Sequence, residues 1–412
     1  MIKKTVLLTG ILIFLVQISF SQYVEGTNND YLGRARAITT AVPFLLISPD
    51  SRAGAMGDVG CATSADPNSQ HHNPAKYVFN ENKIGFSVSY SPWLRGLVND
   101  INLLYLAGYT KVTDMDAIAF SLRYFSLGDI EFMNDDGHSL GTKRPNEFAL
   151  DFTYSRKLID ELSIAITPRF IYSDLTSRTQ SGQTETKPGL AGAADLSLFY
   201  EQDFKTKRLY NQTLRAGLNI SNIGNRMSYS DGTDRRDFIA TNLKLGLGYT
   251  MEFNEYNKLS FTTEFNKLLV PTPPVYRDSL GKPILDENGE KEIFKGKKTP
   301  TNVATAIFQS FADAPEGFKE EMREINFGIG MEYGYRDLLF VRLGYFNESK
   351  YKGGRKFFTI GAGIQYNVLG IDVSYLVAVN QNHPLENTLR FTLTFDFNSF
   401  NKEQIKKQRK LN

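Results

Sequence analysis

The chain has 412 residues, a formal net charge of +2, and hydrophobic residues at 41% of its positions. This near-neutral balance gives no case for nucleic-acid binding, which depends on a strong basic field. The single cysteine, Cys61, excludes an internal disulfide bond. The length would suit two or three soluble domains, but one barrel also reaches it.

Residues 1–21 are typical of a secretory signal peptide. Two lysines precede an apolar run, and the small residues Ser19 and Ser21 flank Phe20 in a cleavage-like pattern. A transmembrane anchor is the alternative, but the run is shorter than the roughly 18–20 residues that a span needs. We therefore expect an exported protein whose mature chain begins near residue 22.

Residues 22–82 are too irregular for strands and are predicted to form an N-terminal segment and a hatch, a plug in the periplasmic mouth of a barrel. Their glycines allow close packing or a positive φ, and their prolines and asparagines start and cap turns. Ordinary loop punctuation is the alternative. The hatch motif residues, with a structural role, are Asp50, Arg52, Gly54, Met56, Gly57, Asp66, Asn73, Pro74 and Ala75.

Two adjacent histidines, His71 and His72, lie within this hatch segment. Because neighbouring side chains diverge on regular secondary structure, we expect a polar plug segment here rather than a pair of metal ligands.

Residues 83–397 are predicted to form the barrel, because apolar and polar residues alternate along segments of about ten residues. In the last segment Leu389, Phe391 and Leu393 share the lipid-facing side, and Arg390 and Thr392 face the lumen. The other charged positions predicted to face the lumen are Asp151, Lys244, Glu332, Arg342 and Asp396.

Fourteen such segments give the even number that bacterial barrels require, and short and long connections alternate between them. We expect the short connections in the periplasm and the long ones outside. The segments are 83–91, 100–110, 115–125, 146–157, 161–173, 189–201, 212–220, 240–251, 257–267, 324–334, 337–346, 355–367, 369–377 and 387–397.

The connection 268–323 is the longest external loop and is too long to be idle. It contains a hairpin-like stretch around Asn288-Gly289 and then an amphipathic helix candidate. We expect the apolar residues of that helix to anchor a partner, since exposed apolar residues mark interfaces. Packing on the barrel rim is the alternative. The proposed partner-binding residues are Val303, Ile307, Phe308 and Phe311.

Chemistry-bearing patterns are scarce, so we expect no enzyme, no catalytic or metal site and no cofactor. His138, His383 and the pair Asp135-Asp136 fall in external loops, where a solvated loop is favoured over a weak Ca²⁺ site. Residues 398–412 form a basic tail, expected in the periplasm as a solvated end.

The order of the motifs is more specific than any one of them. A D-x-R-A-G-x-M-G stretch at residues 50–57, then A-D-P-N at 65–68 and N-P-A at 73–75, precedes fourteen strands. This arrangement resembles the PorV/PorQ family of Bacteroidetes outer-membrane proteins, within the wider FadL-like barrels. The sequence of residues 31–50 is most similar to the PorV (LptO) branch.

The resemblance implies a non-enzymatic outer-membrane component of the type IX secretion system. Such proteins bind the C-terminal signal domain of secreted cargo at the cell surface and dock on the SprA/Sov translocon. They deliver the cargo to the PorU sortase complex, which attaches it to lipopolysaccharide. The rival hypothesis is a FadL-type channel for hydrophobic small molecules, although the charged lumen departs from an apolar path. An accessory role in lipopolysaccharide processing is a third.

Overall fold

The computed structural model describes residues 37–95, 98, 100–133, 139–175, 187–205, 209–229, 236–279, 282–287, 289–379 and 384–397. All of them belong to one compact unit. The predicted signal peptide and basic tail lie outside these residues. In the part of the chain that the structure describes, no helix combines the length and apolarity needed to cross a membrane.

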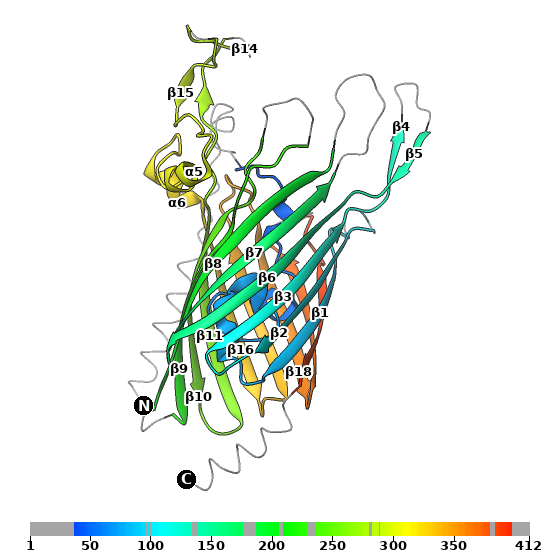
Figure 1. The fold of residues 1–412 in the computed structure, drawn as a ribbon, viewed down its shortest axis with the longest axis vertical. Helices are drawn as coiled ribbons and strands as arrows, with labels where there is room; N and C mark the ends of the chain where they lie inside the picture. Colours follow the sequence, from blue (N-terminus) through cyan, green and yellow to red (C-terminus); the bar gives the residue numbers. More distant parts are fainter. Residues whose placement is uncertain are drawn as a thin grey trace. The chain divides into compact units, whose positions relative to one another are not determined.

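Fourteen antiparallel strands close into a barrel, as the sequence predicts (Figure 1). Each barrel strand pairs with the next barrel strand along the chain, and β20 pairs with β1, so the barrel wall has no free edge. The strands are β1 (Ile84–Pro92), β2 (Asn102–Lys111), β3 (Asp116–Ser126), β6 (Asn146–Ile159), β7 (Leu162–Asp174), β8 (Gly189–Phe204), β9 (Asn211–Gly224), β10 (Asn242–Glu252), β11 (Asn257–Leu268), β16 (Ile325–Tyr335), β17 (Leu339–Asn347), β18 (Lys356–Tyr366), β19 (Leu369–Ala378) and β20 (Leu389–Asp396).

The two faces of the barrel wall follow the alternation in the sequence. On β20, Phe391 and Leu393 are 43% and 41% exposed, whereas Arg390 and Thr392 are each 1% exposed. The exposed side is apolar and forms the band that faces lipid. The predicted facing of this strand is therefore confirmed.

The connections at one end of the barrel are short, as at 112–115, 160–161 and 367–368, and those at the other end are longer. We assign the long end to the outside on this ground. Strand β8 continues further at the short end than the predicted 189–201, and β9 continues further at the long end than the predicted 212–220. The extension of β8 still pairs with β9, as at Asp203, whose carboxylate accepts the hydroxyl of Thr213 at 2.6 Å.

The hatch lies inside the barrel and comprises η2 (Pro43–Leu46), α3 (Ser51–Gly54), α4 (Ser69–His72) and η3 (Pro74–Phe79). Helix α3 packs on β18, β19 and β20, and η3 packs on β6 and β7. The sequence predicts a plug in the periplasmic mouth, but in the structure the hatch extends beyond it. Val42, Phe44 and Leu45 lie in an apolar cluster with Phe125 and Ile171 near the outer strand ends, because inward apolar residues there provide the dry contact that these side chains need.

Residues 269–324, which we call the outer module, follow β11 on the outside. They contain α5 (Val303–Gln309) and α6 (Phe318–Arg323), and a ribbon of short strands. Asn302 caps α5, since its side chain accepts hydrogen bonds from the backbone N–H groups of Ala304 and Thr305. The ribbon strands are β12 (Val275–Tyr276), β13 (Asp278–Ser279), β14 (Lys282–Pro283) and β15 (Ile293–Lys295), and β4 (Ile130–Met133) with β5 (Ser139–Lys143) forms another outer hairpin.

The predicted hairpin of the loop exists within this ribbon. Leu285 pairs with Lys291, and the N–H of Gly289 donates to the carbonyl of Asp286 at 3.0 Å. Gly289 has a φ of +77°, which glycine adopts without strain. Asn288 lies outside the described residues.

Candidate functional site

The first hatch motif begins a short helix. The carboxylate of Asp50 accepts the backbone N–H of Ala53 at 2.9 Å and lies 2.7 Å from Nε2 of His72. Burial opposes the charge on Asp50, but the imidazole and the helix N–H bring its pKa to about 2. Asp50 thus joins the first motif to the histidine pair.

Arg52 ties the hatch to the barrel wall. Its guanidinium donates to both carboxylate oxygens of Glu332 on β16, at 3.0 and 2.9 Å, and to Asp66 in the second motif at 2.8 Å. Arg342 on β17 donates to the same Glu332 at 2.7 Å. A fork-shaped guanidinium between two carboxylates fixes both position and angle, so the two motifs are held against one side of the wall.

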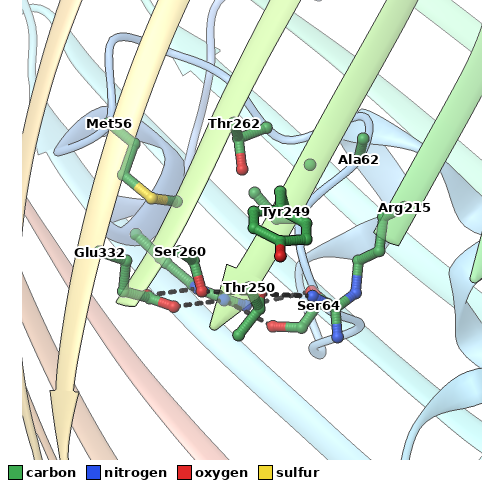
Figure 2. A pocket seen from close by; sticks show the side chains of 12 residues that line it. Met56, Ala62, Ser64, Arg215, Tyr249, Thr250, Ser260, Thr262 and Glu332 are labelled. Atoms are coloured by element: carbon green, nitrogen blue, oxygen red, sulfur yellow. Dashed lines mark hydrogen bonds and ion pairs between the residues drawn. The ribbon is translucent and has the colours of Figure 1, made fainter. Parts of the chain in front are cut away.

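The wall beside this network closes around a small polar pocket (Figure 2). It is lined by Arg52 and Ser64 of the hatch, by Arg215 and Thr250, and by Glu332. Its volume is about 10 Å³, room for about one water molecule. At this place the hatch and the wall leave no path for a larger molecule.

The third motif anchors the end of the hatch. The side chain of Asn73 accepts the backbone N–H of Ala75 at 3.1 Å and donates to the carbonyl of Leu198 on β8 at 2.9 Å. The carbonyl of Ala75 accepts the hydroxyl of Ser163 on β7 at 2.6 Å. Pro74 stands at the first position of η3, where no backbone N–H is needed. Each residue of this motif therefore has a local structural task.

Glycine allows the hatch backbone to touch the wall. Gly57 has a φ of +72°, and a Cβ there would lie 2.6 Å from the carbonyl oxygen of Tyr345. A Cβ on Gly54 would lie 2.3 Å from Arg390, a buried lumen residue that pairs with Asp58 at 3.0 Å. Met56 packs nearby with its Cβ facing Gly330. These contacts leave no space for larger side chains.

The sequence predicts that the side chains of the two histidines diverge, but their rings lie 4.7 Å apart, edge to face. His71 contacts Arg123 on β3, and His72 contacts Asp50. Burial and the charge of Arg123 lower the pKa of His71 well below its usual range, so it is neutral. Among the described residues no group of three or more metal-ligating side chains is arranged to hold an ion.

The predicted lumen charges are buried and paired across strands. Arg169 on β7 lies between Asp151 and Asp195, at 2.5 and 3.0 Å, and Lys244 lies 3.9 Å from Glu264. The carboxylate of Glu264 also accepts the N–H groups of Gly60 and Cys61 in the hatch. The lumen is therefore polar as predicted, and hatch and wall share its charges.

The outer module is fastened to the rim by buried ion pairs. Lys267, at the end of β11, lies 3.1 Å from Glu321 and 2.6 Å from Glu324. Lys352, between β17 and β18, lies 2.6 Å from Glu320 and 2.9 Å from Glu324. Both lysines belong to the barrel side, so α6 is clamped to the barrel by its buried acidic face.

The predicted helix exists, and its four proposed partner-binding residues fall on two faces. Val303 and Ile307 are half-buried beside the buried Ala306, whereas Phe308 and Phe311 are 78% and 49% exposed. The two phenylalanines are thus more accessible to a partner than the other two proposed residues.

Two further exposed residues were missed from the sequence. Phe318 and Met322 are 79% and 51% exposed and are one turn apart on α6. Charged residues separate the two in the sequence, so the six-residue helix does not read as amphipathic. The spacing of four residues is the only sequence signal that places both on one side of the helix. We call Phe308, Phe311, Phe318 and Met322 the exposed apolar residues of the outer module. His138, His383 and Asp135-Asp136 lie outside the described residues.

Solved structures that resemble this fold include the toluene transporter TbuX of Ralstonia pickettii, at 12% identity and a TM-score of 0.42, covering 84% of this chain and 97% of that one. They also include the toluene transporter TodX of Pseudomonas putida, at 11% identity and a TM-score of 0.46, covering 88% and 98%, and a Pseudomonas aeruginosa FadL homologue, at 12% and 0.41, covering 88% and 100%. Likenesses this distant carry no inference about function.

No curated protein matches the sequence. A comparison with protein families matches the family described as type IX secretion system protein PorV over residues 30–275. The match spans more than half of the 412 residues and includes the whole hatch and the strands from β1 to β11. The chain therefore belongs to the PorV family of type IX secretion system proteins and is an outer-membrane β-barrel.

Proposed function

We propose that this protein captures the C-terminal signal domain of secreted cargo at the cell surface, docks on the SprA/Sov translocon and hands the cargo to the PorU sortase complex. Membership in the PorV family supports a role in type IX secretion. The chain itself contributes binding surfaces and no reaction chemistry in this proposal. Lipopolysaccharide enters it only as the acceptor to which the sortase complex attaches cargo.

The observation that carries the proposal is the exposure of the apolar residues of the outer module. Phe308 and Phe318 each leave more than three quarters of the side chain exposed, in a module that ion pairs hold on the barrel rim. Large apolar side chains exposed in water on a firmly held element mark a protein interface. They lie outside the membrane, where both cargo and a neighbouring barrel can reach them.

The double variant Phe308→Asp with Phe318→Asp tests this surface. Burying two carboxylates in an apolar contact is costly, and loss of an interface anchor commonly costs about 2 kcal/mol or more. We expect at least about tenfold less translocon and cargo to co-purify from native membranes. The matched control is Thr305→Asp with Lys319→Asp, which places carboxylates at exposed positions of the same helices.

Heat-modifiable mobility reports whether each variant still forms its barrel. Unchanged recovery of both partners with a folded double variant would mean that the docking surface lies elsewhere than at the exposed apolar residues of the outer module. The rival channel hypothesis predicts uptake of a hydrophobic compound that depends on the lumen and is indifferent to Phe308 and Phe318. The two hypotheses therefore separate in one set of variants.

A further inference from the structure

A hollow of about 480 Å³ lies in the lipid-facing wall of β8–β11. Its floor is at Ala216 on β9, and the larger side chains of Leu198, Tyr200, Leu218, Leu245 and Leu247 stand around it. The strand register explains the shape, because Ala216 is directly opposite Tyr200 on β8 and Leu247 on β10. One small side chain in a row of large ones leaves a dent in the wall.

The floor of this hollow is supported from the lumen side. Gly217 and Gly246 belong to the floor, and an added Cβ would lie 2.2 Å from the carbonyl oxygen of Cys61 at Gly217 and 3.0 Å from Ala62 at Gly246. The hatch therefore presses on the inner side of the backbone that forms the floor. The wall cannot relax inward to fill the dent, so the hollow keeps its shape.

The lower end of the hollow lies on the periplasmic side of the barrel wall. Tyr200 and Tyr249 are close to the periplasmic ends of β8 and β10, at Phe204 and Glu252, and their hydroxyls donate to Gln202 and Gln212. Tyrosines in this position mark the boundary between headgroups and hydrocarbon. The lining begins at this boundary, at Leu162 and Tyr200, and continues to Leu245 and Phe265 toward the outer ends of β10 and β11. A chain that enters at the lower end therefore has its headgroup on the periplasmic side.

We propose that the hollow is a binding site for one acyl chain of a phospholipid from the periplasmic leaflet. Its lining is apolar and faces lipid, so a hydrocarbon chain completes the contacts that the lining atoms lack on their open side. The tyrosine–glutamine pairs at its lower end stand level with the lipid headgroup. The site is independent of the docking role proposed above.

Native mass spectrometry of the full chain in detergent tests the site, with dipalmitoyl phosphatidylethanolamine as the probe and lipid A as the competing source of acyl chains. We expect one phosphatidylethanolamine per wild-type barrel, and at least tenfold lower occupancy in Ala216→Phe, whose ring fills the dent. The control Ala362→Phe, at an exposed alanine on β18, keeps wild-type occupancy.

Several outcomes would overturn the site. They are equal occupancy in wild type and Ala216→Phe, no retained phospholipid in wild type, or preference for lipid A. A fourth is an Ala216→Phe barrel that keeps its lipid but no longer co-purifies with a neighbouring barrel, because the hollow would then seat a protein side chain. Heat-modifiable mobility checks folding, and Ala216→Leu replaces the phenylalanine variant if that variant does not form a barrel.

Discussion

Replacing Arg52 with alanine tests whether ion pairs lock the hatch into the barrel. The change removes the hydrogen bonds of 3.0 and 2.9 Å to Glu332 and the one of 2.8 Å to Asp66. Breaking a buried pair by removing one partner costs about 3–5 kcal/mol, because the remaining charge stays buried. Arg342 still neutralises Glu332 at 2.7 Å, so we expect the lower end, about 3 kcal/mol.

Cys61 offers a direct readout of hatch opening. It is the only cysteine in the chain and is fully buried between hatch and wall, and burial raises the pKa of its thiol to about 12. A maleimide therefore reaches it only through opened molecules, and the labelling rate follows their population when closing is fast. If the free energy of hatch opening falls by about 3 kcal/mol, the labelling rate rises about 150-fold, since about 1.36 kcal/mol changes the population of opened molecules by a factor of ten.

The control variant is Arg144→Ala. Arg144 pairs with Asp129 at 2.8 Å, but both side chains are about half exposed, and such pairs contribute about 0–1 kcal/mol. Its Cys61 labelling rate should match that of the wild type. If Arg52→Ala also labels at the wild-type rate while its mobility stays heat-modifiable, the reasoning fails and apolar packing alone holds the hatch.

Two further predictions concern the wall and the outer module. Leu393→Arg places a charge on the lipid face and should cost roughly 2–4 kcal/mol near the bilayer midplane; refolding into vesicles measures it, and wild-type stability would contradict the assigned facing. The second concerns pH: burial, with Glu321 and Glu324 nearby, raises the pKa of Asp313 to about 6. Because the folded carboxyl holds its proton more tightly than the unfolded one, attachment of the module should weaken as pH rises from about 4 to 6 and then level off. Hydrogen exchange of α6 against pH should show this trend in wild type and lose it in Asp313→Asn; the same slope in both would assign it to another group.

The strands could be predicted because each depends on local pattern. Alternation at period two fixes which residues face lipid, and each barrel strand pairs with the next barrel strand along the chain. The prediction is weakest where that pattern ends, as in the extension of β8 at the short end. There, the polar Asp203 pairs with Thr213 on β9, whose hydroxyl donates to the Asp203 carboxylate at 2.6 Å.

The contacts of the hatch could not be predicted in the same way. Arg52 meets Glu332 across 280 positions of sequence, and no local pattern indicates which of many buried carboxylates it selects. The motifs did indicate caps and close approaches, which are local. In the outer module, amphipathic spacing located α5 but not the partial burial of Ile307, because burial depends on contacts beyond the helix itself.

The fit between the hatch and the inward glycines sets an order of assembly. Gly344 would bring a Cβ within 2.0 Å of the backbone nitrogen of Gly57, and Gly248 within 2.2 Å of the carbonyl oxygen of Ala62. A segment held this closely on several sides cannot be threaded into a finished cylinder. We therefore expect β1 and β20 to pair last, around a hatch that is already in place. During refolding, the protection of Cys61 from pulsed alkylation and the heat-modifiable form should then appear at the same rate. Protection that lags behind that form would mean that the cylinder can open to admit its own plug.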